Sequence, residues 1–240
     1  MEGKALSKKL VAVPVYNEEP SVEKVLNAIV EYAGSAEILV IDDGSTDRSR
    51  QILYQFDGIH LIRHPQNYGY GQSLIDAFAY ASAHGYEAVV TIDCDEQHEP
   101  QQIPEFFAKL AEGWDIVSGS RYLEDVEPVG TVPRDRLKIN RLITAKINEL
   151  TAYNLTDSFC GMKAYRTAAI QKLNLTEPGY AFPLQVWLQA FKAGLTVTEL
   201  PVPLVYMDHF ERSFGGSLDD PQKRLRYYWQ VIEEETKDWN

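Results

Sequence analysis

Two carboxylates and an amide directly follow an apolar segment near the middle of the chain. They are Asp93, Asp95 and Gln97, and the apolar segment spans residues 88–92. Alternate residues beyond a strand end can point the same way, so the two aspartates can hold one cation between them. Hard divalent ions such as Mg²⁺ and Mn²⁺ favour oxygen ligands and complete their shell with substrate phosphates. The spacing therefore indicates a metal and diphosphate site, although the same acidic residues also suit the cap of a helix beginning near Pro100.

Three other polar loops follow apolar segments earlier in the chain. Residues 14–19 are PVYNEE, residues 42–47 are DDGSTD and residues 67–71 are NYGYG. The aromatic ring and the oxygen acceptors of the first two loops suit a nucleobase and a ribose, and glycines before a helix allow phosphate to approach free N–H groups. Each loop also has a structural explanation, as a helix entry or an Asx turn. The glycines do not form a dinucleotide-binding fingerprint, because they follow the third expected strand rather than the first.

The pattern of apolar residues predicts the elements that position these loops. Strands are expected at residues 10–15, 38–41, 59–62 and 88–92, with helical patterns between them. Continuous apolar strands that alternate with helices predict an α/β fold, with a mostly parallel sheet flanked by helices and ligands bound at the carboxyl ends of the strands. Further along we expect a mobile loop at 123–133, helices at 134–150, 182–193 and 222–235, and a strand at 196–206.

Composition excludes several classes of protein. A chain of 240 residues suits one domain with a tail, and a net charge of −12 argues against a general nucleic-acid binder. No apolar stretch approaches the roughly 20 residues needed to span a bilayer, and no signal-like segment precedes the first strand, so we expect a cytoplasmic protein. Cys94 and Cys160 are too few for a disulfide framework, and we expect both to be reduced.

Arginines downstream of the acidic motif are candidate ligands of a phosphate. Arg121 follows an apolar segment, and Arg136 and Arg141 lie on one expected helix. Guanidinium groups bind phosphate through paired hydrogen bonds, which is a geometry that lysine lacks. We expect Arg134 and Lys138 to be solvated surface charges. For Arg121 and Arg136 the residues alone leave surface charge and phosphate contact open, and the family resemblance described next implies phosphate contact.

These motifs, in this order, resemble the large inverting glycosyltransferase family 2 with the GT-A fold, and above all its polyprenyl-phosphate sugar synthases, such as dolichol-phosphate mannose synthase. The resemblance covers about residues 9–206. The matching segments are VPVYNE at 13–18, VIDDGSTD at 40–47, NYGYG at 67–71, DCDEQH at 93–98 with Pro100, GSRY at 119–122, and DSFCGMKAYR at 157–166. The form with Gln97 is more similar to the lipid-phosphate synthases than to the wider family.

The resemblance implies a nucleotide-sugar donor of the GDP-mannose or UDP-glucose type and a Mg²⁺ or Mn²⁺ cofactor. The donor-binding residues that we predict are Pro14, Tyr16, Asn17, Glu18, Asp42, Asp43, Gly71 and Asp93. The predicted metal ligands are Asp93, Asp95 and Gln97. The resemblance also implies a GT-A catalytic domain at residues 1–206, with a donor half at about 9–120 and an acceptor half at about 121–206, followed by a loop and an amphipathic helix at 207–240.

The expected reaction is an in-line displacement at the anomeric carbon, with Asp95, Arg121, Arg136 and Asp157 as the candidate catalytic residues. A lipid phosphate is already an anion, so it needs orientation more than a general base. A hydroxyl acceptor in polysaccharide synthesis would instead need a carboxylate base, for which Asp157 is the candidate. A non-catalytic nucleotide-sugar-binding protein is a further alternative. A haloacid-type phosphatase or a nucleotidyltransferase would need a different first loop from residues 14–19.

Departures from the lipid-phosphate synthases fall on the acceptor side. Val132 replaces an expected tryptophan, Gln185 stands where a glutamate is often found, and the basic motif is altered to HFERSFGG at 209–216. A lipid acceptor would be met at the inner membrane surface, through Phe210, Phe214 or the final helix, or with a membrane-embedded partner. The final helix carries Leu225, Tyr228, Trp229 and Ile232, and we expect it to pack on the core, as helical apolar stripes usually do.

Overall fold

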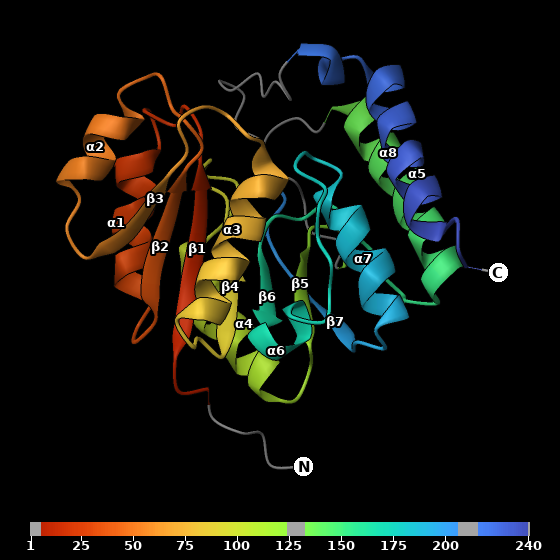
Figure 1. Cartoon of the computed structure of the whole chain (residues 1–240), viewed down its shortest axis with the longest axis horizontal. Helices are drawn as coiled ribbons and strands as arrows, with labels where there is room; N and C mark the ends of the chain where they lie inside the picture. The colour runs from red at the N-terminus through yellow and green to blue at the C-terminus, as the bar shows by residue number, and fades with distance from the viewer. Residues whose placement is uncertain (1–5, 124–132, 206–215, 240) are drawn as a thin grey trace.

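A seven-stranded sheet forms the centre of the protein, as the computed structural model describes it for residues 6–123, 133–205 and 216–239. The strand order is β3-β2-β1-β4-β6-β5-β7, and helices cover both faces of the sheet (Figure 1). The strands are β1 (Lys9–Val15), β2 (Glu37–Asp42), β3 (Ile59–Arg63), β4 (Ala88–Thr91), β5 (Ile116–Ser120), β6 (Lys163–Arg166) and β7 (Val197–Pro201).

The strands are parallel except for β6. Strand β1 pairs in parallel with β2 and β4, β2 with β3, and β5 with β7, whereas β6 is antiparallel to both of its neighbours. The predicted α/β fold with a mostly parallel sheet is therefore confirmed. Because β6 runs in the opposite direction, the segment before it enters the sheet at the edge where the other strands end. That reversal brings residues 157–162 to the same edge as the polar loops.

The helices divide into two layers. The described α-helices are α1 (Val22–Tyr32), α2 (Ser49–Gln55), α3 (Tyr70–Ala83), α4 (Ile103–Ala111), α5 (Arg134–Thr151), α6 (Thr167–Ile170), α7 (Phe182–Lys192) and α8 (Pro221–Thr236), with short 3₁₀ turns at η1 (Pro100–Gln102) and η2 (Gly216–Asp219). One apolar cluster packs α1, α2 and α4 on the sheet, and the other packs α3 and α5 to α8 on the opposite face. Side chains of β1 alternate between them, since Leu10 and Ala12 join one cluster and Val11 and Val13 the other.

The expectation that the last helix packs on the core is confirmed. Tyr228 and Ile232 of α8 are buried in the larger cluster, and Leu225 and Trp229 pack partly buried against it. Helix α8 lies against α5 and α7 (Figure 1). In the sequence it is far from the loops that follow β1 and β2. No helix of the described residues is long and apolar enough to cross a bilayer.

Some expectations differ from the observed elements or lie outside the described residues. The last strand, expected to continue to residue 206, ends at Pro201, because prolines at 201 and 203 cannot donate to a sheet ladder. Most of the loop at 123–133, with Val132, and most of the 209–216 motif, with Phe210 and Phe214, lie outside the described part of the chain.

Candidate active site

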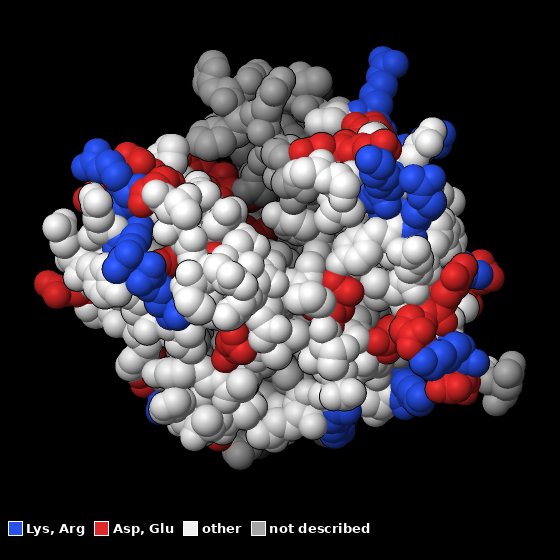
Figure 2. Space-filling view, turned by 45° about the horizontal axis from the view of Figure 1, so that its top comes forward, with Lys and Arg blue, Asp and Glu red and all other residues white. Residues whose placement is uncertain are grey.

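A cavity of about 870 Å³ opens at the carboxyl ends of the strands. The exits of β1, β2, β4 and β5 all contribute to its lining, as the parallel sheet predicts. The other walls come from α3, α5, the segment before α7, and α8. Figure 2 shows the hollow on this side of the molecule, with acidic side chains visible inside it.

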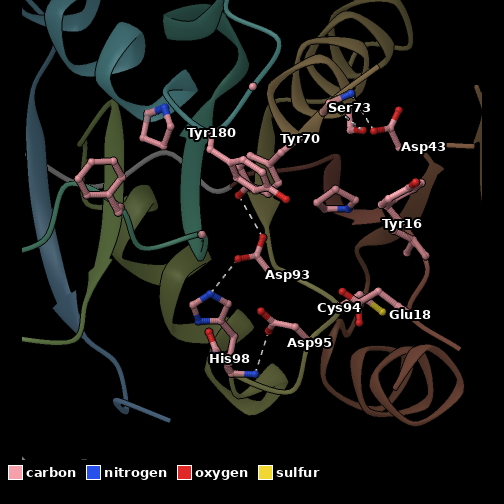
Figure 3. A pocket seen from close by; sticks show the side chains of 18 of the residues that line it. Tyr16, Glu18, Asp43, Tyr70, Ser73, Asp93, Cys94, Asp95, His98 and Tyr180 are labelled. Carbon is pink, nitrogen blue, oxygen red and sulfur yellow. Dashed lines mark hydrogen bonds and ion pairs between the residues drawn. The ribbon is translucent and has the colours of Figure 1, made fainter. Parts of the chain in front are cut away.

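Asp93 and Asp95 both line the cavity at the exit of β4. Asp93 Oδ1 accepts a hydrogen bond from the hydroxyl of Tyr70 at 3.0 Å, and its Oδ2 lies 3.4 Å from Nε2 of His98. Figure 3 shows the carboxylate of Asp93 between these two partners. Asp95 Oδ1 accepts the backbone N–H of Gln97 at 2.9 Å, and Gln97 also lines the cavity. The three residues predicted from the motif therefore meet in one place.

The carboxylate of Asp93 packs against the backbone of the segment before β6. A side chain at Gly161 would place its Cβ 2.0 Å from Asp93 Oδ2, so only glycine leaves room for the carboxylate here. The hydroxyl of Thr91 donates to the Gly161 carbonyl at 2.8 Å and fastens the two segments together. No local pattern in the sequence indicates this contact, because it depends on the antiparallel insertion of β6.

The donor atoms present suit a hard divalent ion. Within the described residues, no group of three or more His, Cys, Asp or Glu side chains is arranged to hold a metal. Mg²⁺ and Mn²⁺ are commonly held by one or two carboxylates together with water and substrate phosphates, so a complete protein cage is not required. Asp93 and Asp95 supply two such carboxylates at the wall of one cavity. The residues present therefore fit an ion that is shared with a diphosphate.

The loops after β1 and β2 are fastened to each other by hydrogen bonds. Asn17 adopts a left-handed conformation with φ of 56°, and its Oδ1 accepts the backbone N–H of Thr46 at 2.8 Å. Its own N–H donates to Ser45 Oγ at 3.0 Å, and the N–H of Glu18 donates to Ser49 Oγ at 2.8 Å. Asn17 thus holds the two loops together through its side chain. The remaining predicted residues of the first loop that line the cavity are Pro14, Tyr16 and Glu18.

The two adjacent aspartates after β2 have different positions. Asp42 is almost fully buried, where its Oδ1 accepts the N–H of Ser45 at 2.8 Å, and it is not among the residues that line the cavity. Asp43 does line it, and its carboxylate accepts the backbone N–H groups of Tyr68 and Gly69 at 2.8 and 2.9 Å. The structure therefore brings Asp43 to the cavity and uses Asp42 inside the turn.

A buried histidine that the sequence motifs did not indicate fixes Asp43. His64 follows β3, with Nδ1 2.6 Å from Asp43 Oδ1 and Nε2 2.8 Å from Asp76 Oδ2. Both ring nitrogens thus lie within hydrogen-bonding distance of carboxylate oxygens. His64 therefore ties the exit of β2 to helix α3.

Gly71 has a packing role in this structure and does not line the cavity. A Cβ at this position would lie 2.2 Å from the carbonyl oxygen of Glu177, so the absent side chain lets α3 approach the segment before α7. The third loop instead presents Asn67, Gly69 and Tyr70 to the cavity. The contact of Gly71 with a donor therefore stays a prediction.

A buried ion pair lies at the wall of the cavity. Arg121 lines the cavity and donates from Nε to Asp157 Oδ2 at 2.6 Å and from Nη2 to Oδ1 at 2.9 Å. Asp157 is fully buried and also accepts from Asn140 Nδ2 at 2.8 Å. Burial alone would raise the pKa of Asp157, but the charge and hydrogen bonds of Arg121 lower it to about 2. Arg136 also lines the cavity, whereas Asp157 does not reach it.

Several residues that line the cavity were not among the predicted site residues. Tyr180 stacks on Tyr70 with ring centroids 5.9 Å apart, and Figure 3 shows both rings above Asp93. Arg224 and Tyr228 reach the cavity from α8. Their positions depend on packing between segments far apart in the sequence, which local motifs cannot report.

Gln185, which departs from the glutamate often found in the lipid-phosphate synthases, is buried at the base of α7. Its Oε1 accepts the N–H groups of Thr176 and Glu177 at 2.7 and 2.8 Å. Its Nε2 donates to Glu235 of α8 at 2.5 Å. A carboxylate at position 185 would face Glu235 as a like charge, so the amide suits the docking of α8.

Comparisons with known proteins agree with this architecture. The profile of glycosyl transferase family 2 matches residues 10–173. A polyprenol monophosphomannose synthase of Mycolicibacterium smegmatis is 27% identical over 219 residues, which cover 87% of this chain and 79% of that protein. An undecaprenyl-phosphate 4-deoxy-4-formamido-L-arabinose transferase of Enterobacter sp. is 32% identical over 229 residues, and the match covers 89% of this chain but only 63% of that longer protein.

A solved structure with the same fold contains both a metal and a nucleotide. Glucosyl-3-phosphoglycerate synthase from Mycobacterium tuberculosis, in complex with Mn²⁺, uridine diphosphate and phosphoglyceric acid, superposes with a TM-score of 0.73. Its sequence is 20% identical, and the match covers 95% of this chain and 78% of that one. The similarity establishes a shared fold.

Proposed function

Because the chain belongs to glycosyl transferase family 2, we propose that it transfers a hexose from a nucleotide sugar to the phosphate of a polyprenyl phosphate, with inversion at the anomeric carbon. The observation that carries this proposal is one cavity lined by two chemically different groups of residues. Asp93 and Asp95 line it together with the loops after β1 and β2, a group that we call the donor end, and Arg121 and Arg136 line it as a second group that we call the acceptor end. The named activities of the polyprenol and undecaprenyl-phosphate relatives support the acceptor class.

At the donor end the residues bind and orient the nucleotide sugar. The ring of Tyr16 is exposed at the cavity wall and is placed to stack on a nucleobase, while Glu18 and Asp43 offer acceptors to base or ribose. Asp93 and Asp95, with Gln97 beside them, would hold a Mg²⁺ or Mn²⁺ ion. When bound, such an ion neutralises the charge that develops on the departing nucleoside diphosphate.

At the acceptor end the residues position an anion. A guanidinium carries five N–H donors, so the pairing of Arg121 with Asp157 through Nε and Nη2 leaves further donors for phosphate. The pair also fixes the plane of the guanidinium. Together with Arg136, Arg121 would hold the nucleophilic phosphate oxygen in line with the anomeric carbon, which is the principal requirement when the nucleophile is already ionised.

Asp157 fits a positioning role better than that of a general base. It is fully buried, and its pKa is lowered to about 2, so it has little affinity for the proton that a hydroxyl acceptor would release. The hydroxyl-acceptor alternative therefore loses its candidate base. We also propose that the protein binds the acceptor lipid at the inner membrane surface, either directly or through a membrane-embedded partner.

Donor titration followed by product analysis tests the proposal. Thermal unfolding is measured with GDP-mannose, UDP-glucose and related nucleotide sugars, with and without Mn²⁺, and labelled product is then sought with and without undecaprenyl phosphate. We expect one nucleotide sugar to raise Tm in a Mn²⁺-dependent way, and label to enter the lipid fraction only when undecaprenyl phosphate is present. If no nucleotide sugar stabilises the protein, or if label passes only to a hydroxyl acceptor, the proposal is wrong.

A further inference from the structure

Helix α8 brings a buried arginine to the acceptor end of the cavity. Asp220 caps the helix by accepting the N–H groups of Gln222 and Lys223, and Pro221 occupies its first turn. These features fix where the helix begins, one turn before Arg224. Arg224 is only 2% exposed and lines the cavity. This helix follows the segment that the family profile matches.

The guanidinium of Arg224 is held by two partners. Its Nη1 donates to the carbonyl oxygen of Leu218 at 3.0 Å, and its Nη2 donates to Asp135 Oδ2 at 2.7 Å. The side chain of Asp135 is 42% exposed, whereas that of Arg224 is 3% exposed. An ion pair between two solvated groups contributes little, but removing the partner of a buried charge leaves that charge uncompensated. The geometry of Arg224 therefore depends on Asp135.

Asp135 in turn belongs to the turn that presents Arg136. Both residues lie in the first turn of α5, which begins at Arg134 after Pro133. Although burial acts to raise it, the pKa of Asp135 is lowered by hydrogen bonds from the Arg224 side chain and from the backbone N–H of Arg136. One carboxylate thus connects the α8 arginine to the backbone of the arginine that we assign to the acceptor phosphate.

The same wall offers an apolar surface next to these charges. Tyr228, one turn after Arg224, packs on Phe159 with ring centroids 4.9 Å apart, and both rings line the cavity with Ile139. A phosphate attached to an apolar chain suits this wall, because the guanidiniums of Arg136 and Arg224 lie at its charged part and the chain can contact its apolar part. A phosphate on a sugar or a small acid would leave that wall unused.

We propose that Arg224 is a positioning residue for the acceptor: through Asp135 it holds the first turn of α5, and with it Arg136, against the phosphate of a polyprenyl phosphate. This inference rests on the proposed function and assigns α8 to the acceptor site. The acceptor half then extends beyond residue 206 to include the terminal helix.

Steady-state kinetics of Arg224→Met in the 240-residue chain test the inference, with undecaprenyl phosphate as acceptor and the accepted nucleotide sugar as donor. Arg226→Met is the matched control, because Arg226 lies on the same helix, loses the same charge and is exposed. We expect the KM for undecaprenyl phosphate to rise about tenfold or more in Arg224→Met, the size of one lost hydrogen bond to a charged group. The KM for the donor should remain unchanged, and Arg226→Met should behave as wild type.

A second variant keeps the test decisive if Arg224→Met folds poorly. Asp135→Asn alters a half-exposed side chain, and it should raise the KM for undecaprenyl phosphate in the same way. If the two residues act as one unit, the double variant should be no worse than the more impaired single variant. A parallel rise of donor and acceptor KM in both single variants would overturn the inference, as would fully additive effects or equality with Arg226→Met. Absence of transfer to undecaprenyl phosphate by the wild-type protein would instead refute the proposed function.

Discussion

The two groups of cavity residues that we assign to the donor and to the acceptor are held in place in different ways. At the donor end, loops that directly follow β1, β2 and β4 present their side chains, and many neutral hydrogen bonds fasten the first two loops to each other. At the acceptor end, ion pairs join residues far apart in the chain, as Arg121 pairs with Asp157 and Arg224 with Asp135. The side chains of the donor end are therefore presented by loops that directly follow strands, whereas those of the acceptor end are held by ion pairs between different elements.

The difference has an energetic consequence. A neutral hydrogen bond contributes about 1 kcal/mol, so the loss of one loop contact at the donor end is partly offset by the others. The loss of one partner of a buried ion pair is not offset in this way, because the other charge remains in a medium of low polarity without its counter-charge. Substitutions at the acceptor end should therefore affect the fold as well as the reaction.

The largest expected effect comes from breaking the Arg121 and Asp157 pair. Asp157→Asn removes the charge opposite a guanidinium that is itself mostly buried, so the free energy of unfolding should fall by about 3–5 kcal/mol. Urea denaturation measures the change, with Asp238→Asn at an exposed position as the control. A loss below about 1 kcal/mol would mean that the pair behaves like a surface ion pair.

The pH dependence of stability sharpens this prediction. The pKa of Asp157 is lowered in the folded protein to about 2 from an ordinary value of 3.8. A carboxyl group with a depressed pKa stabilises the fold above its ordinary pKa, and that contribution is lost as pH falls from about 4 toward 2. The difference in unfolding free energy between wild type and Asp157→Asn should therefore shrink over this interval. A difference that stays constant from pH 6 to about pH 2 would contradict the assigned ionisation.

A donor-end variant should separate binding from stability. His64→Gln removes the ring that bridges Asp43 and Asp76, so Asp43 loses a fixed partner while its backbone contacts remain. We expect the KM for the nucleotide sugar to rise about tenfold, with the acceptor KM unchanged. His84→Gln is the control, because His84 is exposed at the end of α3. Equal changes in both KM values would show that His64 supports the whole fold and not the donor end alone.

A smaller effect is expected where α8 docks on α7. Gln185→Glu places a second carboxylate against Glu235, and the repulsion should lower the free energy of unfolding by about 1 kcal/mol. Adding Glu235→Gln gives a pair with the carboxylate at position 185 and the amide at position 235. Most of the lost unfolding free energy should therefore be recovered. Thermal or urea unfolding of the two variants checks the prediction. A double variant that remains as unstable as Gln185→Glu would show that the contact with Glu235 is not responsible.

The same comparison explains how far the sequence could predict the site. Asp93, Asp95 and Gln97 follow a strand directly, so strand position alone placed them at the cavity. The sequence did not distinguish Asp42 from Asp43. The turn formed with Ser45 decides which of these two adjacent side chains points inward, and that turn is known only from the structure.

Long-range packing accounts for the remaining differences. Gly71 serves the approach of α3 to Glu177, which no local pattern reports. Arg121 was predicted as a phosphate ligand, but its pairing with Asp157 arises from the reversed direction of β6. Arg224 reaches the cavity because α8 packs on α5 and α7.

The central claim is that one cavity holds a nucleotide sugar at one end and a polyprenyl phosphate at the other. The most direct test measures the rate of labelled hexose transfer to undecaprenyl phosphate for wild type, Asp43→Asn and Arg136→Met, while each substrate is varied in turn. We predict that Asp43→Asn raises only the donor KM and Arg136→Met only the acceptor KM, each by about tenfold. If both variants raise both KM values to the same extent, or if the wild type forms no labelled lipid, the claim is contradicted.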